Sequence, residues 1–271
     1  MTQFKRSNGR SYNEMRPVKV TFDTFGYASG STLFEIGNTK VLCSVTMQNT
    51  VPPFLKGKKS GWLTAEYAML PTATKQRTQR ASNAMKEQGR SVEISRLISR
   101  VLRAVVDLDS LGERSIMVDC DVLQADGGTR AASITGACIA LQQAQQRWLN
   151  AKMIEKPFLK DQVAAISAGV MKGEPLLDLN FDEDSMIDGD FNFVLTKSGN
   201  IVEIQGTAEH TLISWVQFEQ LKQLAIDAIA DMFNIVDQLS LAEPKEKRNL
   251  KAPLFSLQNR LQKSSVTDES H

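Results

Sequence analysis

The chain has 271 residues, of which 42% are hydrophobic and 23% charged, and its formal net charge is +1, a balance that suits one large globular domain or two small ones. No run approaches the ~20 apolar residues that a membrane span needs, and the polar N-terminal residues lack the apolar stretch of a signal peptide. The three cysteines have no metal-binding spacing. We therefore expect a cytoplasmic protein without a membrane span, whose thiols are buried and reduced.

The first part of the chain is predicted to form strands. Apolar and polar side chains alternate over residues 18–22 and again over residues 62–70. Residues 32–36 and 40–47 flank Gly37-Asn38-Thr39, a sequence typical of a hairpin turn.

The next predicted element is a helix with one buried face and a basic surface. Ser91 is expected to cap its start, and apolar residues follow at a spacing of three and four: Ile94, Leu97, Ile98, Val101, Leu102 and Val105. Another face carries Arg96, Arg100 and Arg103. Between Thr72 and Arg103 only Glu87 and Glu93 oppose eight basic residues, namely Lys75, Arg77, Arg80, Lys86, Arg90, Arg96, Arg100 and Arg103. This basic run indicates either an anion-binding surface or a solvated helix.

A strand over residues 115–123 is followed by Asp126-Gly127-Gly128-Thr129-Arg130 and then by a helix that is predicted to end near Leu149. Two glycines between a strand and a helix allow a tight turn and leave backbone amides free for an anion. The helix N-terminus and Arg130 would add positive charge. Arg90, at the start of the preceding helix, could join the same pocket. The alternative, a plain turn, stays open, and the pattern of a Walker loop is absent.

The second half is predicted to repeat this outline, with strands over residues 162–171, 176–179, 191–196 and 201–206. Ser214 and Gln217 have the spacing of a capping box, and the helix behind them would bury Phe218, Leu221, Ala225, Ile229 and Met232. We expect an α+β fold in which two related halves pack as one domain over residues 1–238, followed by a polar and mobile tail over residues 239–271.

Six carboxylates and no basic residue occupy residues 178–190: Asp178, Asp182, Glu183, Asp184, Asp188 and Asp190. Magnesium prefers oxygen ligands and needs only one or two protein carboxylates, so this segment is either a metal site or a solvated acidic turn. The single internal histidine, His210, has no candidate nucleophile beside it, which argues against a hydrolase triad. We assign it no role.

These segments together resemble the ribonuclease PH family. The resemblance covers residues 5–238 in order and rests on Gly-Trp-Leu-Thr-Ala-Glu-Tyr-Ala-Met-Leu-Pro at 61–71, Gly-Arg at 89–90 with Glu-Ile-x-Arg-Leu-Ile at 93–98, Leu-Gly-Glu-Arg at 111–114, Asp-Cys-Asp-Val-Leu-Gln-Ala-Asp-Gly-Gly-Thr-Arg at 119–130, Asp-Leu-Asn-Phe-Asp-Glu-Asp at 178–184 and Glu-Ile-Gln-Gly-Thr-Ala-Glu at 203–209.

The resemblance implies a fold of two βαβα-like halves, a homo-hexameric ring built as a trimer of dimers, and a phosphorolytic 3′→5′ exoribonuclease that trims tRNA precursors and other RNA 3′ ends. It implies inorganic phosphate as co-substrate and magnesium or manganese as cofactor. The residues that match its phosphate positions are Arg90, Gly128, Thr129 and Arg130. Asp184 and Asp190 match its catalytic metal ligands, and Arg77 and Arg80 lie in its RNA-entry segment. We predict that these two arginines bind RNA together with Arg96 and Arg100.

The family usually has arginine where Thr72 stands and aspartate where Asn8 stands. A different class of function also fits the resemblance, namely a catalytically silent RNA-binding subunit of an exosome-like ring. Such relatives lack the phosphate and metal residues, whereas all six are present here. A broad degrader of messenger RNA like polynucleotide phosphorylase is less favoured because no KH or S1 domain follows.

Overall fold

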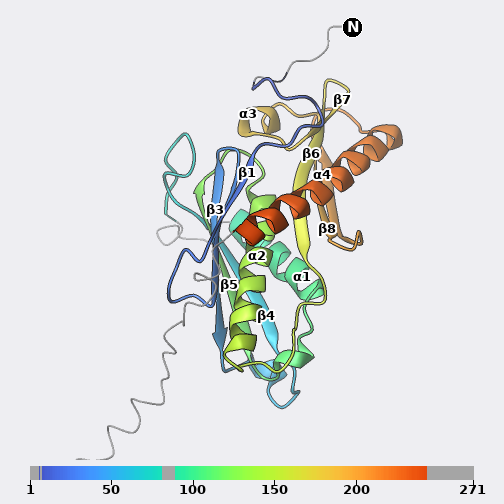
Figure 1. Cartoon of the computed structure of the whole chain (residues 1–271). Helices are drawn as coiled ribbons and strands as arrows, with labels where there is room; N and C mark the ends of the chain where they lie inside the picture. The colour runs from blue at the N-terminus through green and yellow to red at the C-terminus, as the bar shows by residue number, and fades with distance from the viewer. Residues whose placement is uncertain (1–5, 7, 81–88, 243–271) are drawn as a thin grey trace, which may run out of the picture.

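The computed structural model describes residue 6, residues 8–80 and residues 89–242. Over these ranges the chain forms two β-sheets and four α-helices (Figure 1), which confirms the predicted α+β class. Most of the predicted tail, residues 243–271, lies outside the described residues. The last helix continues to Ala242, past the boundary expected after residue 238.

The first sheet has five strands in the order β1-β2-β3-β5-β4. It is antiparallel except for β4 and β5, which run parallel, because α1 connects them as a crossover. The predicted hairpin is confirmed, with a two-residue turn at Gly37 and Asn38 that pairs Ile36 with Thr39. The strands are β1 (Val18–Phe22), β2 (Gly30–Ile36), β3 (Thr39–Gln48), β4 (Trp62–Met69) and β5 (Ser115–Gln124).

The second sheet has four antiparallel strands in the order β7-β6-β8-β9. Every residue of its central strand β6 is buried, so both faces of that strand are covered. The strands are β6 (Val163–Met171), β7 (Glu174–Leu177), β8 (Gly189–Thr196) and β9 (Ile201–Ala208). The strands predicted from alternation are thus confirmed, with ends that differ by a few residues.

Three long helices cover the sheets, and a fourth forms a single turn. Helix α1 (Gly89–Ala104) packs on β4, α2 (Thr129–Asn150) contacts both sheets through β2, β3 and β6, and α4 (Trp215–Ala242) packs on β6 and β7. Figure 1 shows α2 in the middle of the molecule. Helix α3 (Phe181–Asp184) has only four residues. Short 3₁₀ turns occupy Pro53–Leu55 and Asp109–Leu111.

Two predicted helix starts have different outcomes. Ser91 does not cap α1, because the helix already includes Gly89 and Arg90; that prediction was wrong. The capping box at α4 is confirmed, since the Ser214 amide donates to Gln217 Oε1 at 2.9 Å and the Gln217 amide donates to Ser214 Oγ at 3.3 Å.

One hydrophobic core extends through both halves. It includes Phe34 and Leu63 from the first sheet, Ile134 and Leu141 from α2, and Phe193 from the second sheet. A smaller cluster of Met171, Leu176, Leu179 and Ile187 includes two apolar residues of the acidic segment. Because α2 belongs to this core along most of its length, its first turn is held firmly between the two sheets.

Candidate active site

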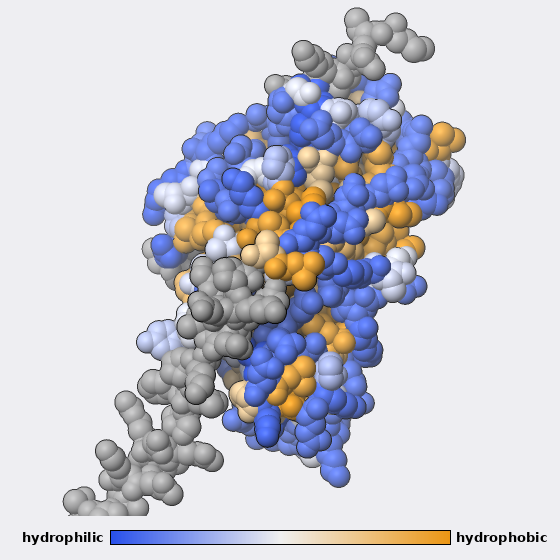
Figure 2. Space-filling view, viewed as in Figure 1, coloured by the Kyte–Doolittle hydropathy of each residue, from blue (hydrophilic) through white to orange (hydrophobic). Residues whose placement is uncertain are grey.

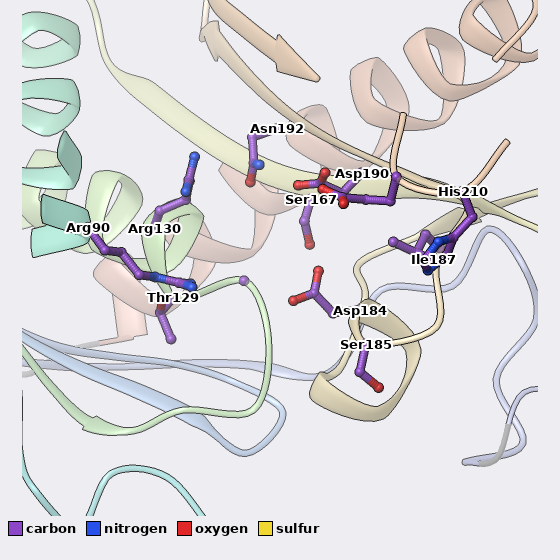
Figure 3. A pocket seen from close by; sticks show the side chains of 12 residues that line it. Arg90, Thr129, Arg130, Ser167, Asp184, Ser185, Ile187, Asp190, Asn192 and His210 are labelled. Carbon is purple, nitrogen blue, oxygen red and sulfur yellow. The ribbon is translucent and has the colours of Figure 1, made fainter. Parts of the chain in front are cut away.

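A cleft of about 440 Å³ lies where the first turn of α2 meets β6, α3 and β8 (Figure 3). All six residues predicted to bind phosphate and metal line it: Arg90, Gly128, Thr129, Arg130, Asp184 and Asp190. They come from four elements in three separate parts of the sequence, and both halves contribute. The structure therefore brings the predicted residues together, while their roles as ligands stay predictions.

The glycine turn in front of α2 forms the floor of the cleft. Gly127 and Gly128 have φ angles of +78° and +67°, a conformation that residues with a Cβ rarely adopt. A Cβ on Gly127 would lie 2.3 Å from the Leu179 carbonyl oxygen, so the turn packs directly on the acidic segment. No side chain caps the α2 N-terminus at Gly128. The first backbone amides of α2 are thus available to an anion.

The wall beside this turn is basic. Arg130 donates to Gln205 Oε1 at 2.5 Å and to Glu93 Oε2 at 3.5 Å, which holds its guanidinium at the mouth of the cleft. Thr129 shares a 2.9 Å hydrogen bond with the buried hydroxyl of Tyr67. Arg90, exposed on α1, joins them from the side, and Figure 3 shows Arg90 and Thr129 across the cleft from the carboxylates.

The opposite wall holds two carboxylates. Burial raises the pKa of the Asp184 carboxyl, and nearby Asp190 raises it further, whereas Arg90 and Arg130 lower it. Burial also raises the pKa of Asp190, and repulsion from Glu209 adds to the shift. Neither Asp184 nor Asp190 forms an ion pair with a residue that the structure describes. Two crowded carboxylates with raised pKa values are stabilised as anions by a cation between them.

The donor set fits a hard divalent cation. The described residues contain no group of three or more His, Cys, Asp or Glu side chains placed to hold a metal. Magnesium, however, commonly uses one or two carboxylates and completes its coordination with water and phosphate oxygens. Asp184 and Asp190, beside a turn whose amides no side chain caps, are a donor set of this kind.

The remaining carboxylates of the acidic run have other partners, so the run as a whole is not a metal site. Asp178 and Glu183 are buried in ion pairs with Arg16 and Arg6. Asp182 pairs with Lys75 at 2.7 Å on the surface, and Asp188 accepts a hydrogen bond from the Lys172 amide at 2.6 Å.

The cleft also has lining residues that the sequence did not indicate: Ser167, Ser185, Ile187, Asn192, Glu209 and His210. Ser167 and Asn192 are paired across β6 and β8, and Asn192 shares a strand face with Asp190. Because alternate residues of a strand point to the same side, the position of Asn192 next to Asp190 could have been predicted from the sequence. His210 lies at the side of the cleft next to Ile187 (Figure 3), although we expected no role for it. The backbone amide of His210 donates a hydrogen bond to the Asp188 carbonyl oxygen at 3.1 Å.

The four residues predicted to bind RNA lie in two places outside this cleft. Arg77 and Arg80 are exposed in the segment after β4. Arg96 and Arg100 line a shallow groove on α1, next to Gln205 and Glu93. Arg100 is engaged there, with Glu203 at 2.5 Å. Their role in RNA binding stays a prediction.

Comparisons with known proteins match most of the chain. Residues 14–146 match domain 1 of the 3′ exoribonuclease family, and residues 161–228 match domain 2. A curated relative named Ribonuclease PH, from Syntrophomonas wolfei, is 49% identical over 228 residues, which cover 84% of this chain and 95% of the relative. The predicted resemblance is thereby confirmed.

Solved structures share the fold at lower identity. An exosome of Archaeoglobus fulgidus with RNA bound to its active site has a TM-score of 0.73 at 23% identity, covering 86% of this chain and 92% of its own. Rrp46 of rice, Oryza sativa, has a TM-score of 0.68 at 20% identity, covering 84% and 97%. In the part of the chain that the structure describes, no helix is both long and apolar enough to cross a membrane. With both family domains present in order, the chain belongs to the 3′ exoribonuclease family.

Proposed function

We propose that this protein is a phosphorolytic 3′→5′ exoribonuclease that trims the 3′ ends of tRNA precursors and of other structured RNAs. The observation that carries the proposal is a single cleft in which a basic, amide-rich wall faces a pair of carboxylates. Inorganic phosphate is the small anion that fits the first wall, and a divalent cation fits the second. The 49% identity to a relative named Ribonuclease PH supports the same reaction.

The residues suggest how the chemistry proceeds. Thr129, Arg130, Arg90 and the first amides of α2 bind and orient inorganic phosphate. One of its oxygens attacks the phosphorus of the last phosphodiester, and the bond from that phosphorus to the 3′ oxygen of the preceding nucleotide breaks. The products are a nucleoside 5′-diphosphate and an RNA shortened by one residue. The same geometry allows the reverse reaction, which adds nucleotides.

Asp184 and Asp190 would hold magnesium or manganese, which would offset the charge that develops on the reacting phosphoryl group and on the leaving oxygen. The protein contributes position and electrostatic stabilisation and forms no covalent bond to the substrate. The raised pKa values of both carboxyls are consistent with this role, because binding a cation favours their ionised forms.

The test is the identity of the small product. We expect a 3′-tailed tRNA precursor to release nucleoside 5′-diphosphates with magnesium and phosphate present, and to stay intact when phosphate is omitted. Nucleoside monophosphates released at the same rate without phosphate would contradict phosphorolysis. RNA binding with no product under either condition would favour the silent ring subunit.

A homo-hexameric ring, built as a trimer of dimers, is the assembly that we propose. Leu212, Trp215 and Val216 at the start of α4 are exposed by 89%, 81% and 70%, and Figure 2 shows hydrophobic atoms at that end of the helix. A second copy would remove this apolar surface from water. Light scattering should give a hexamer, and Trp215→Glu should reduce its size. An active wild-type monomer would contradict the ring.

We further propose a cytoplasmic location, where tRNA precursors are processed. The free, fully buried cysteines Cys43, Cys120 and Cys138 suit a reducing compartment. Fractionation of cells that produce the protein would test this location.

A further inference from the structure

Three arginines from the start of the chain are buried beneath the cleft. The side chains of Arg6, Arg10 and Arg16 are exposed by only 1%, 8% and 5%, and none of them lines the cleft. Burying a guanidinium is costly unless it is paired and hydrogen-bonded. The hydrogen-bond partners of these arginines therefore indicate their role.

Arg16 joins the glycine turn to the acidic segment. Its Nε donates to Asp178 Oδ2 at 2.8 Å and its Nη2 donates to Asp178 Oδ1 at 2.7 Å, a two-pronged ion pair. The same guanidinium donates to the carbonyl oxygen of Asp126 and, at 3.3 Å, to that of Gly127. One side chain thus bonds both segments that meet at the cleft.

Arg6 and Arg10 hold the short helix that ends at Asp184. Arg6 donates to both Glu183 carboxylate oxygens at 2.7 Å, and Arg10 donates to Glu183 Oε2 at 3.3 Å. Glu183 Oε2 also accepts the Asn180 amide at 3.0 Å and so completes the capping box of α3. Since Asp184 is the next residue, its direction depends on how Glu183 is held.

The backbone between these contacts is under strain. Asp178 has φ +52°, a left-handed conformation that persists only where its surroundings enforce it. Arg6 and Arg10 each donate to the Asp178 carbonyl oxygen at 3.0 Å, and the Arg16 amide donates to its carboxylate at 2.8 Å. With Gly127 packed on Leu179, the turn and the acidic segment can move only together.

We propose that Arg6, Arg10 and Arg16 are positioning residues that fix the glycine turn at a set distance from Asp184; the inference rests on the proposed function. Phosphoryl transfer requires the attacking phosphate and the carboxylates of the acidic wall to lie at the correct distance from each other. A misplacement of about 1 Å can reduce the rate about a hundredfold. The N-terminal segment, although outside the cleft, sets that distance.

Arg16→Lys tests the proposal, because lysine keeps the charge but cannot span a carboxylate and two carbonyls at once. Arg147→Lys is the matched control. Arg147 pairs with Asp23 and donates to the Ala28 and Ser29 carbonyls at 3.0 and 3.3 Å, at the far end of α2 from the cleft. Binding of inorganic phosphate to the metal-free full chain is measured by calorimetry, together with melting temperature and the phosphate KM.

We expect Arg16→Lys to weaken metal-free phosphate binding by about tenfold and to raise the phosphate KM in parallel, while Arg147→Lys changes both by less than about twofold. Equal melting temperatures with equal phosphate affinities in the two variants would overturn the inference. If Arg16→Lys does not fold, Arg10→Lys replaces it, with a smaller weakening expected and an unchanged affinity again contradictory.

Arg6→Lys should instead raise the magnesium concentration required for half-maximal rate and weaken calorimetric magnesium binding, because it acts on α3 rather than on the turn. An unchanged magnesium affinity would remove Arg6 from the proposal. A wild-type enzyme that forms no phosphate-dependent product would overturn the proposed function itself. Normal wild-type phosphorolysis with unaffected variants would overturn only the positioning role.

Discussion

The two walls of the cleft are built in opposite ways. On the basic wall, Arg130 and Thr129 already have protein partners, namely Gln205, Glu93 and Tyr67. On the acidic wall, Asp184 and Asp190 have no ion-pair partner among the described residues, and burial and repulsion raise their pKa values. The basic wall is held in place without a ligand, whereas the two carboxylates interact with Arg90 and Arg130 without forming an ion pair with any described residue. Loss of the proposed cation should therefore reduce the rate far more than loss of any one phosphate contact.

The largest effect is expected for Asp184→Asn. Removing one carboxylate should reduce kcat about 10²- to 10³-fold, by analogy with the loss of other transition-state stabilising groups, and leave RNA binding nearly unchanged. Asp182→Asn is the control, because Asp182 lies two residues away and pairs with Lys75 on the surface. Single-turnover kinetics at several magnesium concentrations would check this, and normal turnover in Asp184→Asn would contradict the metal assignment.

Addition of a divalent cation should stabilise the metal-free protein through the acidic wall. A cation at a hundredfold excess over its Kd adds about 2.7 kcal/mol to the free energy of unfolding. Thermal melts with and without magnesium should show this increase in the wild type and not in Asp190→Asn. An equal increase in both proteins would place the cation elsewhere.

A smaller effect is expected on the basic wall. Arg90→Ala should raise the phosphate KM about tenfold, because one charge-assisted hydrogen bond is lost while Thr129, Arg130 and the α2 amides remain. The KM for RNA, measured in the same assays, serves as the internal reference. Should the RNA KM rise and the phosphate KM stay constant, Arg90 would belong to the RNA path.

The smallest effect concerns the segment after β4 that is predicted to bind RNA. Thr72→Arg should steepen the salt dependence of RNA binding by roughly one phosphate contact, a slope change of about −0.7 for single strands. Lys75→Ala should make the salt dependence shallower, by less than one phosphate contact, because Lys75 already pairs with Asp182 at 2.7 Å. Binding of a short 3′-tailed RNA over a salt series would separate the two. If neither change alters affinity or slope, this segment does not contact RNA.

The strands and long helices could be predicted because each repeats its apolar pattern locally. The sorting of the acidic run could not, because it depends on partners far away in the sequence. Asp178 and Glu183 are neutralised by Arg16 and Arg6, which precede them by 162 and 177 residues. The local spacing of residues does not predict ion pairs between segments so far apart in the sequence. Only the fold shows that Asp184 and Asp190 form no ion pair with a described residue.

The helix starts and the cleft lining show the same limit. Serine is a favourable N-cap residue, and Ser91 was therefore predicted to start α1. The helix already includes Gly89 and Arg90, which a rule based on local residue types does not predict. Ser167 lies in a wholly buried strand, where no alternation of apolar and polar residues marks a cleft position. It lines the cleft beside Asn192, its paired residue on β8, a neighbour that only the register of the sheet reveals.

The continuous core has a thermodynamic consequence. Although the family divides the chain into two domains, buried residues of both belong to one cluster, so neither half has a core that it could keep while the other melts. Unfolding should then be cooperative, with one calorimetric transition. The cleft that spans the two halves would persist as long as the fold itself does, and heat inactivation would coincide with global unfolding.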